Sequence, residues 1–212
     1  GKELSYNNLL DLESALSTIL EFEYDQERNS SKSLNAAVIL KHNNPCGAAL
    51  ADSPSNAFRQ ALDCDSISAF GGIVAFNNNV DLAAAELLSN IFLECVVAPS
   101  FDKDALEILH NKKNLRLLQL NKENIKTGKA STFKSISGGI LEQDIDSGVD
   151  QTNEWVCVTQ TKPTSEEFND LRFSWKICKH VKSNAIVISR NQKTIGIGAG
   201  QMNRVGAAKI AL

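Results

Sequence analysis

Short apolar runs that alternate with helical segments constrain the fold of this chain more than any other feature. The runs are a few residues long and rich in Val, Ile and Leu, which is typical of buried strands. Between them, Ser53-Pro54 and Asp81 have the chemistry of helix starts, because Ser and Asp cap the first turn and Pro fits its first position. The expected strands are residues 36–40, 73–76, 94–98 and 115–120. This alternation predicts a layered α/β fold around a largely parallel or mixed sheet.

Further helices are expected on both sides of these strands. Either Asn7 or Asn8 can cap a helix that runs to about Glu21. Ser100 can cap a later helix, over residues 101–110. Residues 121–135 are rich in Lys, Asn, Thr and Ser and show little periodicity. That composition predicts a surface excursion in the middle of the chain.

The C-terminal part continues the alternation. Thr164 and Glu167 have the spacing of a capping box, which predicts a helix beginning there. The apolar stripe expected on this helix is Phe168, Leu171, Trp175 and Cys178. Two strands, 185–189 and 194–197, are predicted next and are joined at Asn191-Gln192. Asn203 is then a candidate cap for a final helix.

Composition excludes several classes of protein. The 212 residues allow one large domain or two small ones, and 42% hydrophobic residues can form a sizeable core. A net charge of −3 argues against a nucleic-acid-binding protein, and no apolar stretch is long enough to predict a membrane span. The five cysteines are odd in number and lack a CxxC pair, which favours reduced thiols and a cytoplasmic location.

The strand 36–40 runs directly into Lys41-His42, the pair of side chains in the sequence that most strongly suggests a catalytic site. Ligands of open α/β sheets bind beyond the carboxyl ends of strands, where this pair is predicted to lie. Pro45 and Gly47 restrict and bend the chain that follows, so residues 41–47 are predicted to form a turn that holds both side chains. The alternative is a solvated loop without a function.

Four segments at strand ends or glycine turns are candidates for one common site. They are residues 41–47, 66–72, 94–99 and 183–204. Loops of this kind converge at an edge of an α/β sheet, although a glycine turn with its aromatic residue in the core explains 66–72 equally well. Arg204 precedes a helix and is suited to meet an anion there, and an exposed arginine without a role is the alternative.

Metal and thiol chemistry fit the sequence poorly. Asn44-Pro45-Cys46 is similar to half of the zinc motif of nucleobase deaminases, but position 49 is Ala and the chain has no HxE motif. Cys46 near His42 suggests a thiolate nucleophile, whereas a small apolar filler is the simpler interpretation. His110 and His180 are both expected at the surface.

Several motifs in order resemble the transformylase part of the AICAR formyltransferase/IMP cyclohydrolase family of bifunctional purine-biosynthesis enzymes. They are Gly1-Lys-Glu-Leu-Ser-Tyr-Asn-Asn8, Lys41-His-Asn-Asn-Pro-Cys-Gly47, Ser68-Ala-Phe-Gly-Gly-Ile-Val-Ala-Phe76, Val97-Ala-Pro99, Val181-Lys-Ser-Asn-Ala-Ile186 and Ile195-Gly-Ile-Gly-Ala-Gly-Gln-Met-Asn-Arg204. The resemblance spans the whole chain. It implies a cytidine-deaminase-like three-layer α/β/α fold with a mixed sheet, built as a duplicated unit and without the zinc of the deaminases.

The resemblance also implies a reaction. A formyl group passes from 10-formyltetrahydrofolate, a co-substrate, to the 5-amino group of 5-aminoimidazole-4-carboxamide ribonucleotide (AICAR), and no metal is required for catalysis. His42 matches the catalytic histidine, a general base for the weakly nucleophilic amine, and Lys41 matches its partner. Asn184 matches a nucleotide-binding asparagine that could also donate to the formyl oxygen. Other matches to binding residues are Asn8, Gly71, Glu94 and Arg204.

Domain organisation follows from the same resemblance. Residues 1–150 are expected to form the first transformylase repeat, and residues 151–212 a linker helix and the beginning of the second. The ring-closing domain of the family would precede Gly1, and further site residues would follow Leu212, so we expect the isolated chain to be inactive. The parent enzyme is expected to be a cytoplasmic homodimer with no nucleic-acid or membrane partner. The alternatives are a non-catalytic nucleotide-binding module and an inactive remnant.

Overall fold

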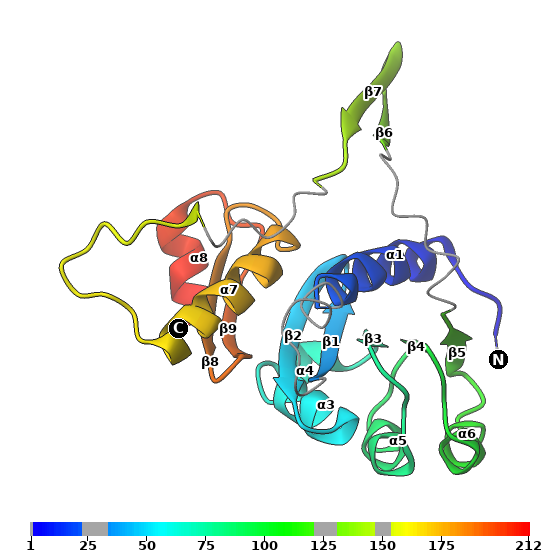
Figure 1. The fold of residues 1–212 in the computed structure, drawn as a ribbon. Coiled ribbons are helices and arrows are strands. Elements are labelled where there is room, and N and C mark those ends of the chain that lie inside the picture. Colours follow the sequence, from blue (N-terminus) through cyan, green and yellow to red (C-terminus); the bar gives the residue numbers. More distant parts are fainter. Residues whose placement is uncertain (1, 23–33, 121–130, 147–153) are drawn as a thin grey trace. The chain divides into compact units, whose positions relative to one another are not determined.

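The structure of the chain is a computed structural model that describes residues 2–22, 34–120, 131–146 and 154–212 (Figure 1). It contains two compact units, of which the larger comprises Gly1–Leu120 with Pro163–Leu212 and the smaller Asn121–Lys162. The boundary expected between residues 150 and 151 lies outside the described residues, so the division into repeats stays a prediction. Within the described ranges, no helix has the length and apolar character needed to span a bilayer.

Helices and strands largely alternate, as predicted. The helices are α1 (Tyr6–Leu20), α3 (Pro54–Leu62), α4 (Ser66–Ala69), α5 (Leu82–Ser89), α6 (Lys103–Leu109), α7 (Ser165–Lys179) and α8 (Arg204–Ala211). The strands are β1 (Asn35–Lys41), β2 (Asn44–Ala51), β3 (Ile73–Phe76), β4 (Cys95–Ala98), β5 (Arg116–Gln119), β6 (Ser131–Ile136), β7 (Gly139–Asp144), β8 (Ile186–Arg190) and β9 (Lys193–Gly198). The exceptions are β1–β2, α3–α4, β5–β7 and β8–β9, which follow one another directly. The strands β6 and β7 form an antiparallel hairpin in the smaller unit.

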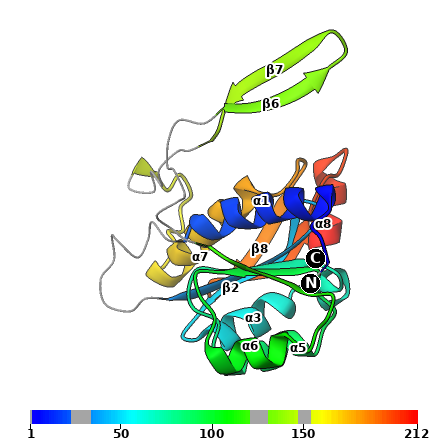
Figure 2. The same ribbon diagram turned by 90° about the vertical axis from the view of Figure 1, so that its right-hand side faces the viewer.

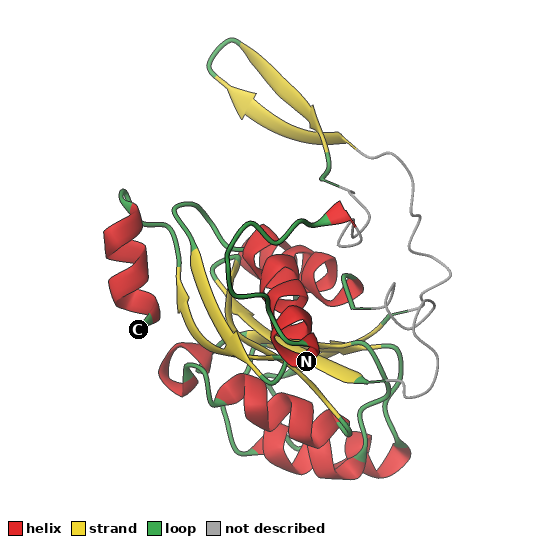
Figure 3. Ribbon diagram, turned by 60° about the vertical axis from the view of Figure 1, so that its left-hand side comes forward, coloured by secondary structure: helices red, strands yellow, loops and turns green. Residues whose placement is uncertain are grey.

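A seven-stranded mixed sheet in the order β5-β4-β3-β1-β2-β9-β8 forms the centre of the larger unit. The strands β3, β4 and β5 are parallel, while β1 is antiparallel to both β2 and β3, and β9 is antiparallel to both β2 and β8. One core lies between the sheet and α1 with α7, and a second lies on the other face under α3, α5 and α6 (Figure 2). Helices flank the sheet on both faces (Figure 3), so the α/β class with a mixed sheet is confirmed.

The prediction of a turn over residues 41–47 is wrong in its extent. Only His42 and Asn43 form the turn, and the chain then continues as β2, which the sequence analysis missed. The missed strand contains Pro45 and Gly47. Both residue types are depleted in strands, so the sequence pattern did not predict a strand here. The residues of β2 are buried over most of its length, as expected of a strand near the centre of a sheet.

Four local predictions also need correction. Ser5, and neither Asn7 nor Asn8, occupies the N-cap position of α1. Ser100 does not cap α6, because Asp102 occupies the N-cap position and the Ser100 hydroxyl donates to Asn79. The predicted stripe on α7 is displaced, since Leu171 and Trp175 are exposed, whereas the buried residues are Phe173, Lys176 and Ile177. His180 is not a surface residue, because only 15% of its side chain is exposed.

Tight contacts between glycine-bearing strands and the helices that follow them set the layer spacing on one face. A Cβ atom on Gly47 of β2 would lie 1.9 Å from the carbonyl oxygen of Ala61 in α3. In the same way, a Cβ atom on Gly196 of β9 would lie 1.8 Å from the carbonyl oxygen of Ala211 in α8. Both helices therefore approach the sheet with their backbones, which only a residue without a side chain permits.

We expect Gly47→Ala to destabilise the protein by about 1–3 kcal/mol, because the added methyl group forces α3 away from β2. Urea unfolding of the purified variant measures this loss. Gly139→Ala in the smaller unit is the matched control, since a Cβ there has no neighbour within 4 Å. Equal stability of the two variants would contradict this close approach of helix and strand.

An ion cluster joins the end of α1 to α7. The Glu21 carboxylate accepts from the Lys179 ammonium at 2.7 Å and lies 3.2 Å from His180 Nε2. The Lys176 ammonium donates to the Glu21 carbonyl oxygen at 2.8 Å and lies over the Phe22 ring. Burial alone would raise the pKa of Glu21, but the hydrogen bonds and charges of His180 and Lys179 outweigh it and lower that pKa.

A lowered carboxylate pKa predicts stability that is present above pH 4.5, the ordinary value for Glu21, and is lost as the pH falls through the pKa of the folded state. We expect Glu21→Gln to cost about 1–3 kcal/mol at pH 7 and progressively less in acid. Unfolding curves at several pH values measure the difference. Exposed Glu86→Gln should show no such trend, and a constant cost of Glu21→Gln across pH would refute this linkage.

Candidate functional site

Lys41 and His42 lie at the β1–β2 turn, at one edge of the sheet. Lys41 is the last residue of β1, and its ammonium donates to the Phe70 carbonyl oxygen at 2.7 Å. His42 is exposed and has a φ of 55°, and Asn43 follows it with a φ of 57°. The pair thus consists of an anchored cation and a solvent-accessible imidazole on neighbouring residues.

Parts of the four candidate segments meet at this edge. The Lys41 bond reaches the 66–72 segment, and the Gly72 carbonyl in turn accepts from the Glu94 N–H at 3.0 Å. On the other side of the hairpin, the Lys182 N–H donates to the Asn44 side chain at 3.1 Å. The Lys182 carbonyl accepts from the Gly200 N–H at 2.7 Å, which brings the 183–204 segment to this edge. Pro99, which follows the opposite end of β4, and the Asn191-Gln192 turn, whose Gln192 carbonyl accepts from the Leu50 N–H, are not at this edge.

The edge is nevertheless a different one from that expected for a parallel sheet. Leu40 of β1 pairs with Ile73 at the start of β3, because the two strands are antiparallel. The carboxyl end of β1 therefore lies beside the amino ends of β3 and β4. Glu94, which directly precedes β4, is at this edge for the same reason. Because the sheet is mixed, carboxyl ends of strands lie at both of these edges, and the rule that ligands bind beyond them does not select one edge.

The predicted binding residues differ in how freely they can meet a ligand. Gly71 has a φ of 76°, and its N–H already donates to the Phe92 carbonyl, so a contact through its own carbonyl is the easier one. Asn184 lies in a cis Ser183-Asn184 segment and donates its side-chain amide to the Gln201 carbonyl at 2.8 Å. Its side chain is half-buried.

Two further predicted residues sit at helix N-termini. Asn8 closes the capping box of α1, because its side chain accepts from the Ser5 N–H at 3.1 Å and its own N–H donates to the Ser5 hydroxyl. A buried capping role thus accounts for Asn8 without a ligand. Arg204 is the exposed first residue of α8, directly after the Asn203 cap, where an anion would also meet the positive end of the helix.

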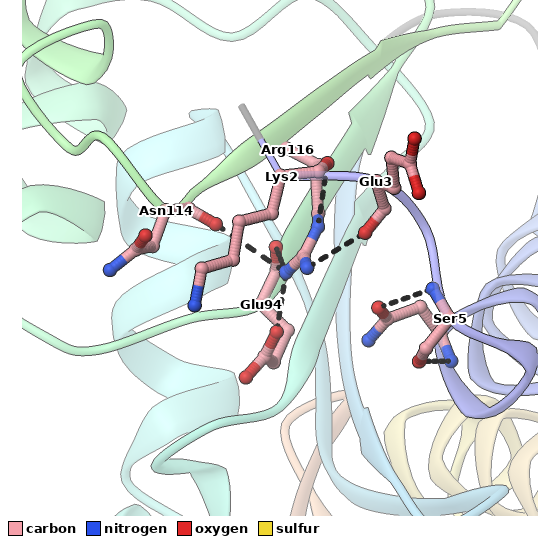
Figure 4. Close-up of polar contacts among 7 residues, drawn as sticks. Lys2, Glu3, Ser5, Glu94, Asn114 and Arg116 are labelled. Carbon is pink, nitrogen blue, oxygen red and sulfur yellow. Dashed lines mark hydrogen bonds and ion pairs between the residues drawn. The ribbon is translucent and has the colours of Figure 1, made fainter.

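Glu94 is held by Arg116 at the start of β5. Figure 4 shows the guanidinium of Arg116 between the Glu94 carboxylate and the chain that leads into α1. One of its nitrogens lies 2.5 Å from Glu94 Oε2, and the other two donate to the carbonyls of Lys2 at 3.2 Å and Glu3 at 2.9 Å. Arg116 therefore orients a predicted binding residue and fastens the N-terminal segment to the sheet.

Sequence reasoning missed two polar residues at this edge, Arg116 and Asp11. Arg116 lies in a predicted strand. An arginine there is ordinarily interpreted as an exposed side chain without a specific role. Asp11 of α1 accepts from the backbone N–H groups of His42 and Asn43. No local signal marks Asp11, because its partners are 31 and 32 residues away in the sequence.

Thiol chemistry is disfavoured at this edge. Burial raises the pKa of Cys46 to about 12, with a further contribution from Asp65, so the residue is a neutral thiol near neutral pH. This agrees with its interpretation as a small apolar filler. The described residues include no group of three or more His, Cys, Asp or Glu side chains that could bind a metal ion.

Comparison with known proteins identifies the family. The sequence profile described as AICARFT/IMPCHase bienzyme matches residues 1–212. The chain belongs to this family. It is 63% identical to the bifunctional purine biosynthesis protein PurH of Prochlorococcus marinus strain MIT 9515, 64% identical to that of strain MIT 9312 and 57% identical to that of strain NATL2A. Each comparison covers 100% of this chain and 41% of the relative, so the chain spans less than half the length of these proteins.

We expect Arg116→Ala to destabilise this family member by about 1–3 kcal/mol, because it leaves the half-buried Glu94 carboxylate without its cation and the Lys2 and Glu3 carbonyls without a donor. Urea denaturation measures the loss. Arg59→Ala is the matched control, since the exposed Arg59 guanidinium donates to a neighbouring side chain, Asn56, on its own helix. If the two variants lose equal stability, the Arg116 bonds do not fasten this edge.

Proposed function

We propose that this chain forms part of an enzyme that transfers a formyl group from 10-formyltetrahydrofolate to the 5-amino group of AICAR. The observation that carries the proposal is the Lys41-His42 pair, anchored on a central hairpin of a chain that belongs to the AICARFT/IMPCHase family. The relatives are named bifunctional purine biosynthesis proteins, and the substrate chemistry fits that naming. The complete protein would carry the second, ring-closing activity in a domain outside this chain.

The exposed imidazole of His42 is suited to act as the base. The amine of AICAR is conjugated with an electron-poor ring and becomes nucleophilic only as its proton leaves, which an imidazole near neutral pH can accept. The formyl carbon forms a bond to this nitrogen while the bond to the folate nitrogen breaks, and that nitrogen leaves with a proton. Lys41 is the proton donor that we assign to the leaving nitrogen.

The remaining residues supply binding. The Asn184 amide is a candidate donor to the formyl oxygen as negative charge develops on it, once a substrate competes with its bond to the Gln201 carbonyl. Glu94, held by Arg116, can accept from hydroxyl or amino groups of the nucleotide. Arg204 at the start of α8 is suited to an anionic group. Gly71 contributes its backbone to nucleotide binding. Asn8 contributes by stabilising the start of α1 through its capping box.

Several properties of the complete protein belong to this proposal. AICAR and the reduced folate are its substrates, no metal takes part in the transfer, and two copies associate as a homodimer in the cytoplasm. The proposal includes no nucleic-acid or membrane partner. The described residues are consistent with chemistry carried by side chains alone, because the candidate base, acid and amide donor come from residues of this edge.

His42→Ala in the complete protein is expected to lower kcat by about 10²–10⁴-fold, the usual contribution of a general base. Formation of formylated AICAR, followed by absorbance or mass spectrometry, measures it. Asn191→Ala is the matched control, because Asn191 takes the same left-handed conformation, φ 54°, in the second hairpin of the chain. Near-normal turnover of His42→Ala would contradict the assignment. A wild-type protein that binds AICAR without formyl transfer would instead favour a non-catalytic module.

A further inference from the structure

The backbone that carries His42 has an unfavourable conformation. His42 and Asn43 form a two-residue turn with φ values of 55° and 57°. The type I′ turn of a two-residue hairpin requires this left-handed geometry at both positions, and Asn and Gly are the residues it favours. Asn adopts this region routinely, whereas for His42 the conformation costs about 1–2 kcal/mol. A further interaction that offsets this cost would stabilise the turn.

The carboxylate of Asp11 supplies that interaction. One of its oxygens accepts from the His42 N–H at 3.3 Å, and the other accepts from the Asn43 N–H at 2.6 Å. Both N–H groups of the turn are thus bound by one side chain of α1. Hydrogen bonds to an ionised acceptor are shorter and stronger than those between neutral groups.

A second contact from α1 reaches the turn through the Asn43 side chain. The Ser14 hydroxyl lies 3.1 Å from the Asn43 amide oxygen. With the amide oriented the other way, its nitrogen donates to Asp11, Ser14 and the Leu10 carbonyl, which satisfies every group better. In either orientation, α1 binds the residue next to His42 by both its backbone and its side chain.

A second hairpin turn of the chain is bound by a helix carboxylate in the same way, but it contains no histidine. Asn191 and Gln192 join β8 to β9 with φ values of 54° each. The Asp170 carboxylate of α7 accepts from their N–H groups at 2.9 and 2.6 Å. Asp170 is the sixth residue of α7, as Asp11 is the sixth residue of α1.

This correspondence extends through both hairpins. A register shift lies between Ile39 and Leu40 before the first turn and between Ile188 and Ser189 before the second. Each helix also begins with a capping box. A carboxylate that closes a left-handed hairpin turn is therefore a recurring element of this fold, and in its first copy the turn bears the candidate base.

We propose that Asp11 is a positioning residue for His42, an inference that rests on the proposed function. By fixing the N–H groups of the turn, Asp11 fixes the direction in which the His42 side chain leaves the backbone. Transfer of a proton from a bound amine is sensitive to displacements of about 1 Å in the base, so a loosened turn lowers turnover before it weakens substrate binding.

The test uses Asp11→Ala in the complete protein, with Asp170→Ala as the matched control. Both variants remove a carboxylate from an equivalent turn, and both are expected to lower thermal stability by similar amounts. Only Asp11→Ala is expected to lower kcat, by about 10–100-fold, with the KM for AICAR within about threefold of wild type. Asp11→Asn keeps one acceptor oxygen and places an amide against the other N–H, so its kcat should be intermediate.

The inference is overturned if Asp11→Ala retains wild-type kcat, or if Asp170→Ala loses kcat to the same degree. A rise in KM alone would assign Asp11 to substrate binding and would also overturn it. If Asp11→Ala does not fold, Asp11→Asn decides, because wild-type turnover of that variant contradicts the role. Failure of the wild-type protein to transfer formyl groups would refute the proposed function itself, and this inference would fall with it.

Discussion

The antiparallel hairpin of β1 and β2 is the element on which the rest of the larger unit depends. Its two strands pair with β3 on one side and with β9 on the other, so the hairpin connects the parallel half of the sheet to the C-terminal half. Both strands are buried along most of their length. Its turn lies at the edge where the candidate residues meet, and two left-handed residues there are stable because α1 supplies a carboxylate.

Polar contacts between residues far apart in the sequence fix the helices and loops around this hairpin. Arg116 ties the start of β5 to the Glu94 loop and to the segment that enters α1. At the other end of α1, Glu21 binds Lys179 and His180 of the C-terminal part. The helix that holds the His42 turn is thus fastened at both ends, and electrostatic pairs complement the apolar layer beneath it.

Much of the local structure could be predicted because it depends on neighbouring residues. The Thr164–Glu167 capping box and the Asn203 cap form as the sequence indicates. The sequence analysis missed β2 because Pro45 and Gly47 are poor strand residues, and tertiary burial outweighed that propensity. It misplaced the inner face of α7, where Lys176 is buried. Its ammonium donates to the Glu21 carbonyl and lies 5.8 Å from the centre of the Phe22 ring.

The sequence by itself determined the α/β class, most helix starts and the candidate residues, because caps, periodicity and family motifs are local patterns. Only the tertiary structure decided which sheet edge gathers them. The antiparallel pairing of β1 with β3 places Lys41 and His42 beside Glu94 at the amino ends of parallel strands. It also decided that Asp11 closes the turn of His42, because 31 residues separate them and no local pattern encodes that contact.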